Sequence, residues 1–321
     1  MKFSVMTLLG IAGVSAFASI VQAGTLIPVI PVPQSVETDV RGINDQNIIV
    51  GTYYTSDYVA HGFFGTLNGQ YTTFDYGGDS TATNAFEIND SGYVTGWAKA
   101  PGFQYGYEFI RNPDGTFVTV SRNGAPVDGF MNGVLTKRGK FVGSYWDPAN
   151  SVLKSYYGKK GKYVKDLTLP FATIWTAARG SNSTESVIVG DFVSTVGQQS
   201  GWLLKGGVET TINYPDANAA ATLLWDINDS GLATGFWKDA NRNFHPFTLD
   251  TTTGIFTQMD VPGAVFQQML GINSAGFIAV DTDVGSFVYC PKSKKKCPGN
   301  ANAAVIGKST YVRARRFLGY E

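Results

Sequence analysis

The sequence contains two histidines, His61 and His245, and their side chains are one group of candidates for catalysis. An imidazole can act as a general acid or base near neutral pH, and its neutral form binds metals. Each histidine stands ten residues after a glycine that ends a similar short string, at Gly51 and at Gly235. Tyr107 occupies the related place in another copy of the pattern, so convergence of these three side chains is one hypothesis for a catalytic site.

A structural interpretation of the same residues stays open beside the catalytic one. His61 begins a His-Gly-Phe string, in which the histidine can serve simply as part of a strand. Two histidines also fall short of the three protein ligands that a catalytic zinc site normally uses. The sequence therefore predicts no metal site and no cofactor, and it favours a protein without enzymatic activity over an enzyme.

Aromatic rings close to carboxylates, amides or a guanidinium form a second group of candidates. Such a mixture suits carbohydrate binding, because rings stack on sugar faces while polar groups exchange hydrogen bonds with hydroxyls. The candidate ligand-binding residues are Asp57, Tyr105, Trp146, Asp147, Trp237, Asp239 and Arg242. For rings that closely follow a repeat glycine, Trp237 among them, packing between repeats is the favoured alternative.

These candidates recur because the sequence is built from repeats. An Ile-Asn-Asp string that begins at Ile43 and ends at Gly51 returns over 88–96 and 227–235, with weaker copies elsewhere. The strings end at positions 51, 96, 143, 190, 235 and 280, so successive copies are 45 to 47 residues apart. Asn and Asp before a turn cap the backbone, and we favour this role for the Asn-Asp pairs over metal binding by an acidic ring.

Each repeat contains four short segments of strand-forming residues, separated by turns such as Asn68-Gly69 and Asp114-Gly115. Such pairs supply the positive φ angles that tight hairpins require. Four short antiparallel strands in each of six copies predict an all-β fold, namely a six-bladed β-propeller of four-stranded antiparallel blades. The N-terminal segment 26–33 is expected to pair into the last blade and close the ring, with segment 303–306 as a competing candidate.

The first 23 residues predict a cleavable signal peptide, because a positive start precedes an apolar stretch and small residues. The repeats are expected within residues 24–308, and a C-terminal tail of unassigned role within 309–321. Cys290 and Cys297 lie close together, which in an exported protein predicts a disulfide. We therefore expect a secreted or periplasmic monomer that has no membrane-spanning segment after the signal peptide.

The charge balance excludes one class of partner. The chain has 25 basic and 25 acidic side chains, so its formal net charge is zero. Proteins that bind nucleic acids generally need an excess of basic residues to neutralise phosphates. The sequence therefore predicts no nucleic-acid partner.

The Ile-Asn-Asp-x-Gly and His-Gly-Phe patterns resemble the HAF family of extracellular repeats, found in secreted bacterial proteins. The resemblance covers about residues 30–290 and is clear in the first, second and fifth copies. It implies a secreted, propeller-like repeat protein, and it supplies no catalytic motif that can be carried over. The function expected is a non-enzymatic binding or interaction module for glycans or cell-surface polymers. The alternative is a propeller enzyme such as a polysaccharide lyase or lactonase.

Overall fold

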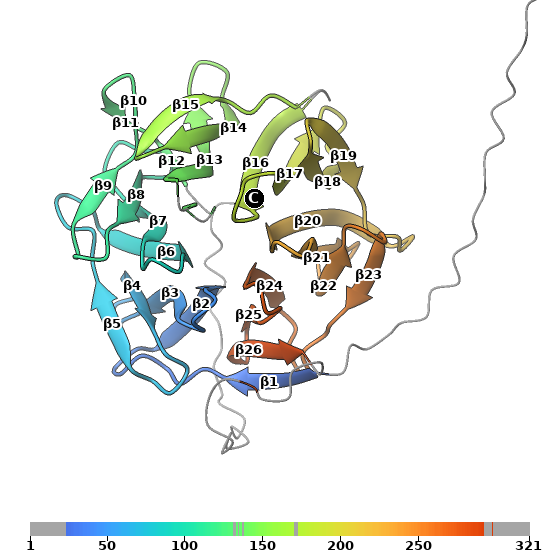
Figure 1. Cartoon of the computed structure of the whole chain (residues 1–321), viewed down its shortest axis with the longest axis horizontal. Coiled ribbons are helices and arrows are strands. Elements are labelled where there is room, and N and C mark those ends of the chain that lie inside the picture. Colours follow the sequence, from blue (N-terminus) through green and yellow to red (C-terminus); the bar gives the residue numbers. More distant parts are fainter. Residues whose placement is uncertain are drawn as a thin grey trace, which may run out of the picture.

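The protein is described by a computed structural model that covers residues 24–130, 133, 135–136, 138–169, 173–291 and 297. In this part of the chain all regular secondary structure is β, and the sheets are arranged around a common centre (Figure 1). Strands β2, β6, β16, β20 and β24 lie nearest that centre. No helix of the described residues is long and apolar enough to cross a membrane. The predicted signal peptide, the tail 309–321 and segment 303–306 lie outside the described residues.

The first two repeats each form one antiparallel sheet in which neighbours along the chain are neighbours in the sheet. The first sheet contains β2 (Glu37–Ile43), β3 (Ile49–Tyr54), β4 (Ala60–Gly65) and β5 (Tyr71–Phe74). The second sheet contains β6 (Ala82–Ile88), β7 (Val94–Lys99), β8 (Tyr107–Arg111) and β9 (Phe117–Thr119). The prediction of four antiparallel strands is confirmed for these repeats.

The third repeat departs from the predicted four strands. Its sheet has six, in the order β11-β10-β15-β14-β13-β12. They are β10 (Ser121–Arg122), β11 (Ala125–Pro126), β12 (Gly129–Phe130), β13 (Lys140–Asp147), β14 (Val152–Lys159) and β15 (Lys162–Asp166). The extra pair arises because Asn123 and Gly124 adopt φ angles of 52° and 84°, which folds the connection into a tight turn.

The fourth and fifth repeats share an eight-stranded sheet. The fourth supplies β16 (Thr173–Ser181), β17 (Val187–Ser194), β18 (Gln199–Lys205) and β19 (Val208–Ile212). The fifth supplies β20 (Ala219–Ile227), β21 (Leu232–Asp239), β22 (Phe244–Asp250) and β23 (Ile255–Gln258). A single parallel pair, Gln199 with Ala221, joins the two antiparallel groups, so each group keeps the strand order of the first sheet.

The last sheet joins both ends of the described chain. It has the order β1-β26-β25-β24, with β1 (Gly24–Pro28), β24 (Gln267–Ile272), β25 (Ile278–Thr282) and β26 (Gly285–Pro291). Strand β1 runs antiparallel to β26, from Gly24 opposite Pro291 to Pro28 opposite Phe287. The disulfide between Cys290 and Cys297 is present as predicted, and such bonds are typical of proteins outside the cytoplasm.

The repeat glycine has a steric cause. A Cβ added at Gly51 would overlap the backbone carbonyl oxygen of Asp39 on β2, and one at Gly96 would overlap that of Asn84 on β6. The innermost strand therefore crosses so closely over the second strand that a side chain is excluded there. Each of these innermost strands also carries a register shift, which re-aims the residues beyond it.

Asparagines at the ends of the innermost strands connect one repeat to the next. The Oδ1 of Asn44, Asn89, Asn228 and Asn273 accepts N–H groups two and four residues later, which confirms the predicted turn role. Each Nδ2 donates to a backbone carbonyl of the following repeat. Its acceptors are, in that order, Asn89, Leu135, Asn273 and Asn44. We call these four residues the asparagine belt.

Aspartates next to the belt add a second set of links. The Oδ1 of Asp90 accepts the N–H of Asp45, and the Oδ1 of Asp45 accepts the N–H of Ser274. Asp229 accepts both the N–H and the hydroxyl of Ser183. The Asn-Asp pairs therefore serve the turns and the contacts between repeats.

Replacing Asn273 by alanine is expected to destabilise the protein by about 2–4 kcal/mol. The side chain is only 3% exposed, and its loss leaves the N–H groups of Ala275 and Phe277 and the carbonyl of Asn44 without these bonds. Urea unfolding of the mature chain would measure the change. Asn68→Ala, in an exposed hairpin turn, is the matched control; equal effects of the two substitutions would contradict this role of the belt.

Candidate functional site

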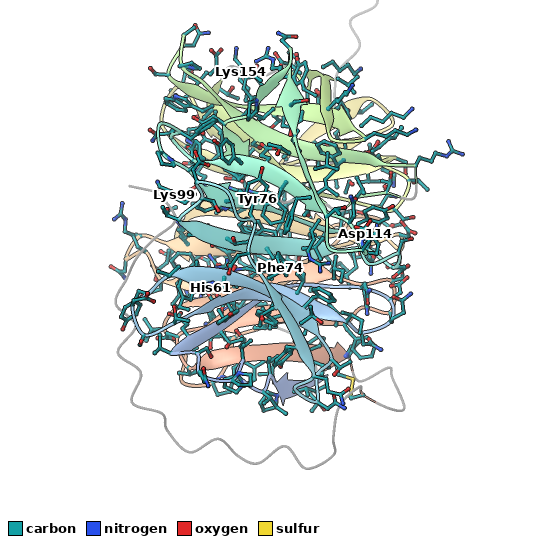
Figure 2. All side chains as sticks on the ribbon, turned by 90° about the vertical axis from the view of Figure 1, so that its left-hand side faces the viewer. His61, Phe74, Tyr76, Lys99, Asp114 and Lys154 are labelled. Carbon is teal, nitrogen blue, oxygen red and sulfur yellow. A yellow bond between two sulfur atoms is a disulfide. The ribbon has the colours of Figure 1, made fainter. Side chains whose placement is uncertain are left out.

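The turns lie on two opposite faces of the ring. The asparagine belt lies at the turns between first and second strands, and we call that side the belt face. The turns between second and third strands lie on the other side, together with the ends of the fourth strands; we call it the loop face. Figure 2 shows His61 and Lys99 toward one face and Asp114, in a turn between third and fourth strands, toward the other. All the candidate ligand-binding residues predicted from the sequence are in or beside loop-face turns.

His61, at the start of β4, lies in a polar cluster on the loop face. Its Nδ1 is 2.8 Å from the Oδ1 of Asp75, and its Nε2 is 3.3 Å from the hydroxyl of Thr55. The imidazole stacks on Tyr53, with ring centroids 5.1 Å apart. Asp75 stands at the end of the fourth strand, so strands that are adjacent in the first sheet build the whole cluster.

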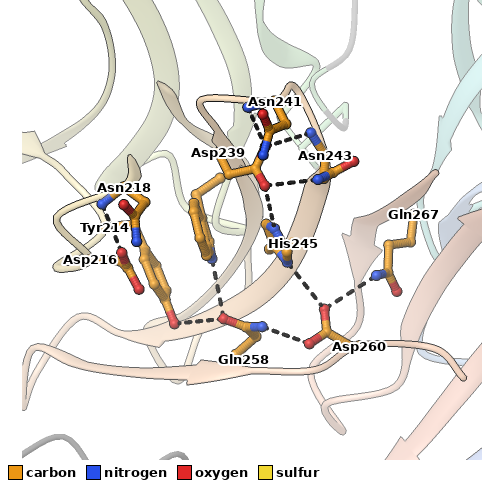
Figure 3. Close-up of polar contacts among 11 residues, drawn as sticks. Tyr214, Asp216, Asn218, Asp239, Asn241, Asn243, His245, Gln258, Asp260 and Gln267 are labelled. Atoms are coloured by element: carbon orange, nitrogen blue, oxygen red, sulfur yellow. Dashed lines mark hydrogen bonds and ion pairs between the residues drawn. The ribbon is translucent and has the colours of Figure 1, made fainter. Parts of the chain in front are cut away.

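His245 occupies the equivalent place in the fifth repeat (Figure 3). Its Nε2 is 3.8 Å from Asp239 and its Nδ1 is 3.6 Å from Asp260. The imidazole stacks on Trp237 with centroids 4.2 Å apart. Asp260 also accepts a hydrogen bond from the Nε2 of Gln258 at 2.6 Å. The imidazole thus lies between two carboxylates, each beyond hydrogen-bond distance in this structure.

The hypothesis that His61, His245 and Tyr107 converge on one catalytic site is wrong. His61 and His245 belong to β4 and β22, in different sheets, and each is surrounded by side chains of its own repeat. Tyr107 lies in the second sheet, packs on Phe103 and donates to Asp79 at 3.3 Å. In a ring of repeats, side chains at equivalent positions lie at similar distances from the axis. They can meet only if they point toward that axis.

Trp237 is a packing residue and not a ligand-binding one, which agrees with the packing role favoured for it in the sequence analysis. It is 5% exposed, and its indole lies between two rings. Tyr214 stacks on it at 4.9 Å with an interplanar angle of 11°, while His245 stacks on it at 4.2 Å. Both partners use its ring faces, which leaves no face for a sugar.

The loop-face aspartates cap their own turns. Asp57 accepts from the hydroxyl of Thr55 and the N–H of Val59. Asp239 accepts three bonds from Asn241 and Asn243. Arg242, between those two asparagines, takes a φ of 67° that the turn requires, as does Tyr58 with 60° in the equivalent turn of the first sheet.

Asp147 also forms an ion pair with Lys154 across the β13–β14 hairpin. Hydrogen bonds from Lys154 and Asn150 lower the pKa of Asp147 to about 2. The carboxylate is thus ionised at any physiological pH.

Tyr105 and Trp146 come from neighbouring sheets and meet on the loop face. Their ring centroids are 6.3 Å apart at 64°, and both rings are half-buried. Asp128 joins the two loops: its carboxylate accepts the N–H groups of Gln104, Tyr105 and Gly106 at 2.8 to 3.2 Å. Its backbone carbonyl accepts the N–H of Trp146 at 2.7 Å. We call Tyr105 and Trp146 the aromatic shelf.

Two buried carboxyl groups, Glu87 and Asp226, lie in the channel at the centre of the ring. The channel encloses about 110 Å³ and is lined on the belt side by the Ile-Asn-Asp strings. Burial raises the pKa of Asp226 to about 7. Hydrogen bonds from the N–H groups of Ile272 and Ile227 partly oppose this rise. Burial and the negative charge of Asp226 raise the pKa of Glu87 well above its ordinary value. The described residues bring together no group of three or more His, Cys, Asp or Glu that could hold a metal.

No family model and no curated protein match this chain. A structure of a putative TolB from Agrobacterium tumefaciens superposes with a TM-score of 0.53 at 13% identity, over 70% of this chain and 80% of that one. A mutant of AofleA from Arthrobotrys oligospora superposes with a TM-score of 0.53 at 14% identity, over 84% of this chain and 86% of that one. The chain has a β-propeller fold. At these identities the likeness concerns the fold of the propeller alone.

The sequence interpretation missed Glu87, Asp226 and Asp128. A signal for the first two existed, because the residue before the repeat isoleucine is glycine at Gly42 and Gly271 but acidic at positions 87 and 226. Asp128 lies in the irregular third repeat of the propeller, where no equivalent position marks it.

Asp226→Asn is expected to flatten the pH dependence of stability. Because the folded pKa of about 7 exceeds the ordinary value of 3.8, the folded state keeps a proton that the unfolded chain releases. Stability is therefore fully present below pH 4, and it is lost as the pH rises toward 7, by roughly 4 kcal/mol at most. Urea unfolding between pH 4 and 8 in EDTA would measure it. Equal slopes for the parent and Asp226→Asn would contradict the assignment; Asp79→Asn, at an exposed carboxylate, is the control.

Proposed function

We propose that this chain is a secreted six-bladed β-propeller of HAF-type repeats that binds a glycan or cell-surface polymer on its loop face. Each of the six repeats contributes one group of strands, and the group of the last repeat is completed by β1. The eight-stranded sheet divides at the single pair Gln199–Ala221, which supports counting it as two blades. The disulfide Cys290–Cys297 and the signal-like first 23 residues support export.

The aromatic shelf is the observation that carries the binding proposal. Asp128 holds the loops of Tyr105 and Trp146 before any ligand arrives, so little conformational entropy is lost on binding. Phe130 supports Tyr105 from behind, with ring centroids 5.3 Å apart. Aromatic rings that are fixed before binding are a common feature of sugar recognition.

Trp146→Ala is expected to weaken glycan binding about tenfold, since a stacked ring contributes roughly 1.4 kcal/mol. The mature chain would be titrated with oligosaccharides of cellulose, chitin and alginate, followed by calorimetry and tryptophan fluorescence. Tyr58→Ala is the matched control, because Tyr58 is a 53% exposed aromatic in a loop-face turn of another sheet. Loss of binding in the Tyr58 variant but not in the Trp146 variant would move the site away from the shelf. Absence of binding to every probe would count against a glycan ligand.

The second candidate function is a propeller enzyme, such as a polysaccharide lyase or lactonase, that uses His245. The observation in its favour is the position of the imidazole between Asp239 and Asp260. If this cluster is catalytic, the mature chain converts a uronate polymer or a lactone, and His245→Gln lowers the rate at least about a hundredfold. His61→Gln, in the equivalent cluster, is the control. Turnover that survives His245→Gln would exclude this mechanism.

A further inference from the structure

The two channel carboxyls meet near the axis of the ring, although they come from opposite sides of it. Glu87 belongs to β6 and Asp226 to β20, which face each other across the centre in Figure 1. The Oδ2 of Asp226 accepts the N–H of Ile272 at 3.0 Å. A Cβ added to Gly271, the preceding residue, would lie 2.7 Å from the Oε1 of Glu87. Consecutive residues of β24 therefore touch both carboxyl groups.

Glycines make the room that these carboxyls occupy. A Cβ at Gly42 would lie 2.5 Å from the Oε2 of Glu87, and one at Gly180 would overlap the Oδ1 of Asp226. Gly42, Gly180 and Gly271 hold the same place in their repeats as Glu87 and Asp226 do in theirs, immediately before the residue that precedes the belt-face turn. Two acidic side chains thus extend into space that three repeats leave empty.

Among the residues that the structure describes, two buried oxygens in this space have no hydrogen-bond partner. The first is the Oε1 of Glu87, a residue that is 4% exposed, and the second is the Oγ of Ser181, a residue that is 2% exposed. Both residues line the channel. Ser181 stands where the neighbouring repeats have Ile227 and Ile272, so a hydroxyl replaces an apolar side chain at this point. An unpaired buried oxygen costs about 1–3 kcal/mol, and more if it is charged, so native proteins seldom retain one without a purpose.

Two arginines next to the channel glycines form ion pairs with acids outside the Glu87–Asp226 pair. Arg41, next to Gly42, lies 3.2 Å from Asp39. Arg179, next to Gly180, lies 2.7 Å from Asp191.

We propose that the channel binds a hard divalent cation, Ca²⁺ or Mg²⁺, between the carboxylates of Glu87 and Asp226 and the hydroxyl of Ser181. Such cations prefer carboxylate, carbonyl and hydroxyl oxygens, and Ca²⁺ takes six to eight of them. A space of about 110 Å³ admits the ion together with water molecules that complete its shell. With two carboxylates the dissociation constant is expected near that of extracellular calcium modules, about 10⁻⁴–10⁻³ M.

The belt face provides the route of entry. Asp45, Asp90 and Asp229 are exposed around the mouth of the channel and line its outer part. Carboxylates at the mouth of a low-dielectric channel raise the local concentration of cations. Their oxygens also accept the hydrogen bonds between repeats, so the ions would pass a rigid rim.

The experiment compares the melting temperature of the EDTA-treated mature chain at pH 8 in NaCl with that after CaCl₂ or MgCl₂ is added to about 10 mM. A bound cation is expected to raise the melting temperature by several degrees, since that concentration exceeds the expected dissociation constant. Glu87→Gln and Asp226→Asn should each weaken the binding of Ca²⁺ about tenfold or more in calorimetry. Both variants should fold, because a neutral amide is easier to bury than a carboxylate.

Glu108→Gln is the control, because Glu108 is equally buried but receives the hydroxyl of Tyr156 between the second and third blades. It should keep the full response to Ca²⁺. The proposal is overturned if neither cation changes the melting temperature at matched ionic strength. It is also overturned if both channel variants, shown to be folded by circular dichroism, still bind Ca²⁺ with the parent affinity. Neither outcome bears on glycan binding at the aromatic shelf, which lies on the opposite face.

Discussion

The structure depends on an asparagine side chain that, in four of the repeats, bonds both to its own turn and to the next repeat. Its carbonyl oxygen accepts the N–H groups of its own turn, and its amide donates to the backbone of the next repeat. Asn273 applies the same pattern between the last repeat and the first, across 229 residues of sequence. Because each bond is buried or half-buried, a gap in the belt would leave backbone groups without partners. Formation of one turn and docking of its neighbour are therefore coupled.

The close approach of the strands also determines which residues lie near the axis of the ring. At Gly51, Gly96 and Gly235 the innermost strand approaches the second strand so closely that a side chain would overlap a backbone carbonyl. The register shifts of the innermost strands aim the residues beyond them at the axis. Most repeats place glycine or an apolar residue there. Glu87, Ser181 and Asp226 break that rule, and the burial of the two acids opposes folding as the pH rises. Residues that weaken the fold in this way are typical of functional sites.

On the loop face, most aspartates bond to the turns of their own repeat. Asp57, Asp147 and Asp239 stabilise their own hairpins, which leaves the aromatic residues as the variable part. Between the second and third blades, Asp128 bonds to both aromatic segments, through its carboxylate to Tyr105 and through its backbone carbonyl to Trp146. A repeat protein can thus keep a uniform scaffold while one irregular repeat supplies the contact surface.

The sequence by itself determined the repeats, their four-stranded pattern, the turn role of the Asn-Asp pairs and the disulfide, because each rests on local spacing. Only the tertiary structure decided three other features. These are the irregular third repeat, the separation of His61 from His245, and the burial of Trp237 between two rings. The tertiary structure also decided that Glu87 lies near Asp226 and that Tyr105 lies near Trp146. Strand patterns reflect which face of a sheet is buried, over a few residues. Which side chains meet depends on how the repeats are placed around the axis, and no local pattern in the chain encodes those distances.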